Sequence, residues 1–241
     1  MQRNILFTLL GLAVFTFVAS CGSAEKSEIR ARRALAIGEY AEAASHYQQA
    51  YRLTPPSEKA RRARLAYALG ESYRRYGASS RALAAFRTAE RYHLTDTLTF
   101  LRQGQMAMLQ GDYKGALIAF ENQSKLSPDN STLAAAQKRA EQGMLQAKKA
   151  IAERGETSLY TVKAAAQFNG NRSDYAPMLL GQGKEQQLYF TTTRSAVLGN
   201  DVSGITAQKN GDVFFVQLDE KGRWKTPEPV LSINTPQDEG A

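Results

Sequence analysis

Residues 77–94 read GASSRALAAFRTAERYHL, and residues 111–128 read GDYKGALIAFENQSKLSP. The two segments start 34 positions apart, and each has an alanine five positions after its first glycine and a phenylalanine four positions further on. A related segment, GEYAEAASHYQQAYRLTP, starts at Gly38 and has a tyrosine in place of the phenylalanine. Repetition at a period of this length predicts an array built from one repeated supersecondary unit.

The repeated unit is helical in pattern. Between residues 24 and 153 the chain is rich in Ala, Leu, Arg, Gln and Glu, and apolar residues recur at spacings of three and four. The first two segments are 39 positions apart, which indicates an insertion of about five residues around Pro55 and Pro56. Small side chains at fixed positions allow two helices to approach closely, and the aromatic residue fills the space between neighbouring hairpins.

These positions resemble the tetratricopeptide repeat, a helix–turn–helix unit that stacks into a superhelix. The matching residues of the second repeat are Gly70, Tyr73, Ala82, Phe86 and Ala89. Those of the third are Gly104, Gly111, Tyr113, Ala116, Phe120 and Pro128, with Gln123 where alanine is usual. The first repeat is degenerate, with Ala31 and Ala34 where glycine and a bulky aromatic residue are common. The resemblance implies about three repeats over residues 21–153, closed by a capping helix from about residue 130 to residue 152. The alternative is a helical bundle without repeats.

The same resemblance implies where a partner binds, because the first helices of successive repeats line the concave surface in that family. The implied groove residues of the second repeat are Arg64, Tyr67, Glu71, Arg74 and Arg75, and those of the third are Leu101, Gln105 and Met108. Guanidinium groups grip carboxylates, so we expect an acidic, partly apolar peptide. The alternative is that these arginines only keep the helix surface soluble.

The N-terminus predicts export. Residues 1–20 read MQRNILFTLLGLAVFTFVAS, and the apolar stretch from Ile5 to Val18 is about fourteen residues long, which is short for a membrane span. The following VASC resembles the lipobox of bacterial lipoproteins, which implies a signal peptide over residues 1–20 and lipidation at Cys21. The alternative is an ordinary signal peptide with an incidental cysteine. Cys21 is the one cysteine of the chain, so no internal disulfide can form.

After Gly155 the composition changes to short β-branched and aromatic runs separated by Gly, Asn, Asp and Pro. SLYTV, QQLYFTTT and DVFFVQL have the pattern of strands. GQGKEQ at residues 181–186 predicts a turn between two strands, and LDEKGRW at residues 218–224 predicts a tight hairpin.

Residues 168–194 and 211–241 resemble the WD40-like propeller repeat of bacterial envelope proteins. The matching elements are Ser173-Asp174-Tyr175-Ala176-Pro177, Leu188-Tyr189-Phe190 with Arg194, Asp212-Val213-Phe214, Trp224 with Pro227, and Asn234-Thr235 with Asp238-Glu239. The resemblance implies that Trp224 packs between blades and that residues 154–241 begin a propeller. Since propellers need about four to eight blades, we expect this one to be incomplete. Either the chain is the N-terminal piece of a longer protein, or it borrows blades from a partner.

Together these features predict an α+β multidomain fold, an N-terminal α-solenoid of tetratricopeptide hairpins followed by a β-propeller blade. A lipobox, tetratricopeptide repeats and a propeller in this order resemble outer-membrane lipoproteins of Bacteroidetes-type envelopes. Many of those carry an OmpA-like peptidoglycan-binding domain, and some belong to type IX secretion and gliding assemblies. The resemblance implies a non-catalytic scaffold on the periplasmic side of the outer membrane, anchored in the lipid through Cys21, with other envelope proteins as partners. The alternative is a glycan- or peptidoglycan-binding module, and peptidoglycan binding would require a further C-terminal domain.

The net charge is +8, with arginines concentrated between residues 30 and 102. In an exported protein without base-stacking aromatic patterns, this charge suits anionic lipid, acidic protein or wall polymer, and not nucleic acid. His46 and His93 have no partner at metal-ligand spacing. We therefore predict no metal, no cofactor and no catalytic residue. Acid–base chemistry by Asp174, Asp212 and Asp238, or a hydrolase completed by further blades, is the remote alternative.

Overall fold

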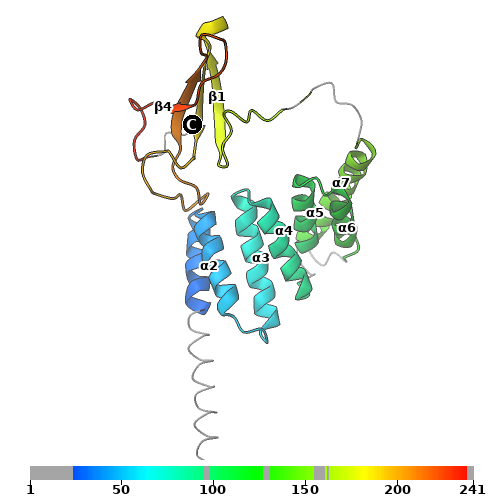
Figure 1. The fold of residues 1–241 in the computed structure, drawn as a ribbon. Helices are drawn as coiled ribbons and strands as arrows, with labels where there is room; N and C mark the ends of the chain where they lie inside the picture. The colour runs from blue at the N-terminus through cyan, green and yellow to red at the C-terminus, as the bar shows by residue number, and fades with distance from the viewer. Residues whose placement is uncertain (1–23, 95–97, 127–130, 155–160, 162, 238–241) are drawn as a thin grey trace, which may run out of the picture. The chain divides into compact units, whose positions relative to one another are not determined.

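The computed structural model describes residues 24–94, 98–126, 131–154, 161 and 163–237. The chain divides into two compact units, Met1–Glu156 and Thr157–Ala241, which are described separately. In the first unit, residues 24–36 are helical. They are followed by α2 (Tyr40–Leu53), α3 (Lys59–Arg75), α4 (Ser79–Arg91), α5 (Thr99–Leu109), α6 (Tyr113–Ser124) and α7 (Ser131–Ala152). Figure 1 shows these helices side by side in chain order. Among the described residues, no helix has both the length and the apolar character that a membrane crossing needs.

The helices form hairpins with the same turn. Gly38, Gly77 and Gly111 all have a left-handed backbone, with φ of 86°, 83° and 71°. After Gly77, the Ala78 N–H donates to the Tyr73 carbonyl at 2.9 Å, and equivalent hydrogen bonds follow the other two glycines. This is the Schellman arrangement, which satisfies the last carbonyls of a helix and reverses the chain. The predicted helical hairpins are therefore present, and the repeated glycine ends the first helix of each one.

Aromatic rings of the second helices pack directly on glycines of the first helices. A Cβ atom at Gly70 would lie 2.7 Å from the Phe86 ring, and one at Gly104 would lie 2.4 Å from the Phe120 ring. The other edge of the Phe120 ring meets Gly143 of α7, where a Cβ atom would lie 2.6 Å away. Phe120 is therefore inserted between the backbones of α5 and α7. The predicted capping helix receives the preceding hairpin as another first helix would.

Gln123 stands where the repeat pattern has alanine, and the structure gives a reason. The side chain is buried, with 1% exposed. Its Oε1 accepts a hydrogen bond of 2.9 Å from the Leu101 N–H. Leu101 lies in the first turn of α5, where backbone N–H groups have no partner within the helix. Gln123 thus caps α5 from the neighbouring helix.

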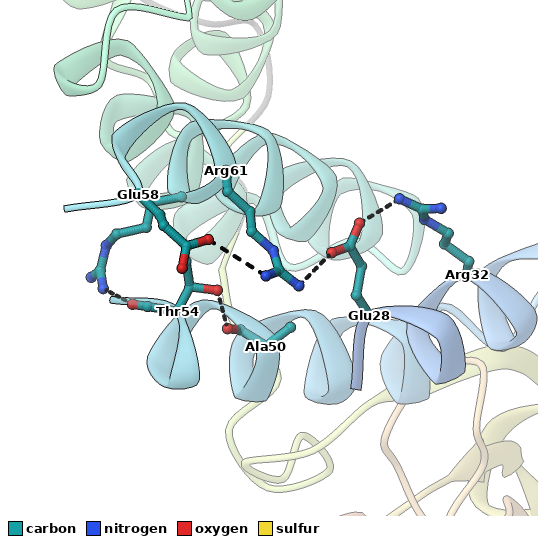
Figure 2. A network of polar contacts seen from close by, with 7 residues as sticks. Glu28, Arg32, Ala50, Thr54, Glu58 and Arg61 are labelled. Atoms are coloured by element: carbon teal, nitrogen blue, oxygen red, sulfur yellow. Dashed lines mark hydrogen bonds and ion pairs between the residues drawn. The ribbon is translucent and has the colours of Figure 1, made fainter. Parts of the chain in front are cut away.

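Two arginines join the first hairpin to the second across the inserted residues. Arg61 of α3 pairs with Glu28 at 3.3 Å and with Glu58 at 3.5 Å, and Figure 2 shows Arg32 on the other side of Glu28. Arg62 donates to the Thr54 carbonyl at the end of α2 at 2.7 Å. Its guanidinium also lies 4.1 Å from the centre of the Tyr51 ring. A cation at a helix C-terminus interacts favourably with the helix dipole. The Arg62 contact therefore stabilises the longer connection between α2 and α3.

The second unit contains a four-stranded antiparallel sheet in the order β1-β2-β3-β4. The strands are β1 (Asp174–Leu180), β2 (Gln187–Thr192), β3 (Asp212–Gln217) and β4 (Glu228–Pro229), with the short 3-10 helix η1 (Gly183–Glu185) between β1 and β2. The predicted turn at residues 181–186 is present and carries φ of 74° at Gly181. The predicted hairpin at residues 218–224 is also present, closed by the bridge between Leu218 and Trp224. Among the described residues of this unit, the strands form one small sheet, and a propeller is not shown.

The sheet unit has a small core. Phe190, Val197, Phe214 and Val216 are buried together, and Phe168, Leu188 and Trp224 pack against them. The Trp224 ring meets the Phe168 ring edge-on, with centroids 5.4 Å apart. Among the described residues, Trp224 thus packs within its own unit, whereas the resemblance implied packing between blades.

Side chains of the propeller-like motif connect this sheet to the loops before, between and after its strands. Arg194 donates to Asp174 Oδ1 at 2.9 Å and to the Phe168 carbonyl at 2.8 Å. Asp212 is fully buried, and its Oδ2 accepts the Leu198 N–H at 2.8 Å. Asn234 forms a pair of hydrogen bonds with the backbone of Val213, at 3.0 and 2.9 Å. These positions therefore have structural roles.

Candidate partner-binding face of the helical unit

Helix α3 has two opposite faces. Ala66, Leu69 and Tyr73 lie on the side toward α2 and α4. With 3.6 residues per turn, Arg64, Tyr67, Glu71 and Arg74 fall on the other side of the same helix. Arg64, Tyr67, Glu71 and Arg74 form one surface with Arg75 and with neighbouring residues of α5, and we call this surface the first-helix face. The residues of α5 are Arg102, Gln105, Met108 and Leu109.

Glu71 is the centre of a charged cluster that joins two hairpins. Its carboxylate lies 2.8 Å from Arg74 on the same helix and 2.7 Å from Nε of Arg102 on α5. Arg102 also donates to Gln105 Oε1 at 3.0 Å. The side chains of Glu71 and Arg102 are each 16% exposed, so their attraction is less weakened by water than that of a surface pair. The cluster fixes side chains of successive first helices relative to one another.

Tyr67 lies beside this cluster and packs on Phe86, with ring centroids 5.5 Å apart. Burial raises the pKa of the Tyr67 hydroxyl, and the charge of Glu71 adds to this, while Arg102 and Arg74 act in the opposite direction. The hydroxyl therefore stays neutral at physiological pH. The hydrogen bond to Glu71 raises the pKa of the Arg74 guanidinium. Arg74 is thus a charged but already paired group.

The accessible cations of this face are Arg64 and Arg75, both exposed. The Arg75 guanidinium lies 5.4 Å from the centre of the Tyr40 ring, which gives it one neighbouring aromatic group. Leu109 stands 34 positions after Arg75, at the same place in the next repeat, and is 71% exposed. An exposed leucine beside exposed arginines suits a partner with carboxylates and an apolar side chain.

The structure corrects one predicted groove residue. Leu101 is only 1% exposed and belongs to the core of the helical unit, so a partner cannot contact its side chain. The reason is that α7 packs against α5 and places Ser131, Thr132 and Ala136 beside this position. Gln105 and Met108 are half-buried on the face. Arg102 and Leu109 were not predicted; the 34-residue period applied to Arg75 points to Leu109, but no pattern pointed to Arg102.

Other predicted groups are in different surroundings. Cys21 and Asp238 lie outside the described residues. His46 Nε2 is 3.4 Å from Glu42 Oε1 one turn earlier, and His93 lies two residues after the end of α4, with a left-handed φ of 62°. Asp174 binds the Gly170 N–H at 2.6 Å in addition to Arg194. Within the described part of the chain, no three His, Cys, Asp or Glu side chains are grouped so that they could hold a metal ion.

Comparison with known proteins gives a structural likeness only. No protein-family model matches the chain, and no curated protein matches it significantly. Among solved structures, 21 chains match. One is the crystal structure of the Sgt2 TPR domain from Aspergillus fumigatus, which is 20% identical, with a TM-score of 0.41, over 59% of this chain and 89% of that chain. At this level the likeness supports no statement about partners or activity.

Proposed function

We propose that the protein is a non-catalytic scaffold of the bacterial cell envelope that binds other envelope proteins through the first-helix face. The observation that carries this proposal is the cluster of Glu71, Arg74 and Arg102, which holds charged side chains of two successive hairpins in place around Tyr67. A surface whose charged groups are already ordered loses little conformational entropy on binding. Arg64 and Arg75 are exposed and form no ion pair with a carboxylate of the described residues, so they supply charge, and the exposed Leu109 supplies apolar area.

Charge reversal at the exposed arginines tests this function. We expect the double variant Arg64→Glu and Arg75→Glu, in the full-length protein, to recover its envelope partners about tenfold less well than the wild type, because like charges then meet the acidic partner. Arg74 is left unchanged, since its loss would leave the Glu71 carboxylate with one partner fewer. Partner recovery from solubilised envelopes, measured at low and moderate salt, is the readout.

The matched control reverses two exposed lysines of α7 that are not among the residues of the first-helix face. The substitutions, Lys138→Glu and Lys148→Glu, change the net charge equally. We expect normal recovery from this variant, and wild-type recovery that weakens with added salt. Equal losses in both variants would mean that only net charge matters. Retention on purified sacculi in preference to envelope proteins would replace the scaffold by the alternative of glycan or peptidoglycan binding.

The proposed location is the outer membrane, on the periplasmic side, with the chain held by lipid on Cys21. This rests on the VASC sequence that follows the apolar N-terminal stretch. Several acyl chains attached to one residue anchor a protein almost permanently.

We expect Cys21→Ala to move the mature protein from the membrane pellet to the soluble fraction, because the variant has no thiol to carry the lipid. Fractionation after alkaline carbonate washing measures this, with Cys21→Ser as a second variant of similar size. A protein that still pellets in both variants would contradict lipid anchoring at this residue.

We further propose that the sheet unit is one blade of a β-propeller, as in envelope components of the type IX secretion and gliding kind. The support is the meander order of its strands and the unusual exposure of β1. Met178, Leu179 and Leu180 are 53%, 55% and 45% exposed, on both faces of this edge strand. Apolar strands of this kind are covered in closed propellers by neighbouring sheets.

A further inference from the structure

The helical unit has a groove on the side of α3 opposite to the first-helix face. It has a volume of about 790 Å³ and lies between α2 and α4, and α3 forms its floor. The floor is apolar and is made by Ala66 and Leu69 of α3 with Ala84 and Ala85 of α4. Because α2 and α4 are the second helices of successive hairpins, none of the residues predicted to bind a partner lies in this groove.

Three arginines surround the groove. Arg52 comes from the end of α2, and Arg81 and Arg91 come from the two ends of α4. Their contacts are with neutral groups: Arg52 with Gln48 at 3.5 Å, Arg91 with Thr88 at 3.1 Å, and Arg81 with the ring of Tyr73 at 5.9 Å from its centre. Within the described residues, none of the three forms an ion pair with a carboxylate, and the lining contains no acidic residue.

Four other arginines of the helical unit differ from these three in their partners. Arg61, Arg74, Arg87 and Arg102 all pair with carboxylates of the same unit. The groove thus concentrates three uncompensated positive charges above an apolar floor. Guanidinium groups positioned in this way bind carboxylates and phosphates in a forked geometry. The apolar floor favours a peptide over a phosphate polymer, because a peptide can place an aliphatic or aromatic side chain there.

We propose that the groove between α2 and α4 is a docking site for an acidic segment of a partner protein, whose carboxylates contact Arg52, Arg81 and Arg91 while one apolar side chain lies over Ala66, Leu69 and Ala85. The groove shares no residue with the first-helix face, and its ligand is an acidic segment that carries an apolar side chain. A scaffold with both surfaces binds two segments at once, one on each side of α3.

The test uses the full-length protein and a short fluorescein-labelled peptide of glutamates interrupted by a leucine and a phenylalanine. Fluorescence anisotropy measures its Kd at low salt. We expect the variant Arg52→Gln, Arg81→Gln and Arg91→Gln to bind it about tenfold or more weakly. The control Lys114→Gln, Lys138→Gln and Lys148→Gln removes the same number of charges from exposed residues outside both the groove and the first-helix face, and is expected to bind within about twofold of wild type. Circular dichroism checks that each variant has the wild-type helical signal.

A second variant tests the floor without a change of charge. Ala84 is exposed and lines the groove, so Ala84→Phe fills part of it, and we expect weaker binding of the same peptide. A second peptide, made of glutamates alone, should bind the wild-type protein more weakly than the peptide that contains leucine and phenylalanine. Equal binding of these two peptides, equal losses in the groove and control variants, or tighter binding of inorganic polyphosphate than of the peptide would each overturn the proposal.

Discussion

Replacement of Phe120 by alanine is expected to lower the free energy of unfolding of the helical unit by about 3–5 kcal/mol. The ring is 3% exposed and touches Gly104 of α5 on one edge and Gly143 of α7 on the other. Its removal leaves a cavity between α5, α6 and α7. The surrounding structure relaxes only partly into such a cavity, so most of the lost packing is not recovered. Urea unfolding followed by circular dichroism measures the loss.

The control for this prediction is Ile118→Ala, which removes an apolar side chain from the same helix. Ile118 is 60% exposed, and we expect a change within about 0.5 kcal/mol. Phe120→Leu, which fills part of the space, should lie between the two. If Phe120→Ala changed stability no more than Ile118→Ala does, the ring would not hold α5, α6 and α7 together.

Arg194→Met is expected to destabilise the sheet unit by about 2–4 kcal/mol. The substitution removes the 2.9 Å ion pair with Asp174 and the hydrogen bond to the Phe168 carbonyl. It also removes a cation that lies 5.2 Å from the Phe190 ring centre and 5.1 Å from that of Phe214. The side chains of Arg194 and Asp174 are only 19% and 11% exposed, so the carboxylate that remains is poorly solvated.

The one tryptophan of the chain makes this prediction measurable apart from the helical unit. Trp224 packs on Phe168, whose carbonyl accepts from Arg194, and tryptophan fluorescence therefore reports the unfolding of the sheet unit. Arg223→Met is the matched control, because Arg223 is 71% exposed and pairs with Asp219 at the surface. If the two substitutions shifted the unfolding midpoint measured by fluorescence equally, Arg194 would not stabilise the sheet unit in the way described.

The same pair contributes to the pH dependence of the sheet unit. Burial acts to raise the pKa of the Asp174 carboxyl, but hydrogen bonds from Thr192, the Gly170 N–H and Arg194 outweigh it, so the pKa lies below the ordinary value. A carboxyl with a lowered pKa in the folded state contributes stability above its unfolded pKa, near about 4, and loses it as the pH falls further. We expect the unfolding midpoint of the wild-type sheet unit, followed by tryptophan fluorescence, to decrease as the pH is lowered below about 4. The unfolding midpoint of Arg194→Met should decrease less over the same pH range.

The helical unit was largely predictable from the sequence because its packing repeats. The period of 34 between Gly77 and Gly111 carries the turn, and the phenylalanine nine positions later packs on a glycine of the preceding helix in both repeats. The pattern failed at Leu101, which occupies the same repeat position as Tyr67. A small difference in packing leaves Tyr67 half-exposed, whereas Leu101 is buried. Periodicity fixes the direction of a side chain only to within such differences.

Contacts between charged residues could not be predicted in this way. The pairing of Glu71 with Arg102 depends on the distance between α3 and α5, which no spacing along the chain encodes. In the sheet unit, Asp174 and Arg194 both belong to the propeller-like motif. Their contact depends on the register that places Asp174 opposite Thr192. The groove and the first-helix face, which lie on opposite sides of α3, can likewise be distinguished only when the positions of α2, α4 and α5 are known.

Site-specific photo-crosslinking measures whether the first-helix face binds envelope proteins. A photoreactive phenylalanine at Leu109, which is 71% exposed on this face, is compared with one at Ile118, which is 60% exposed on α6. We predict that irradiated cells yield a defined crosslinked protein from position 109 and none from position 118, and that Arg64→Glu with Arg75→Glu removes the product. The same product from both positions, or from position 109 irrespective of the arginines, would contradict the account.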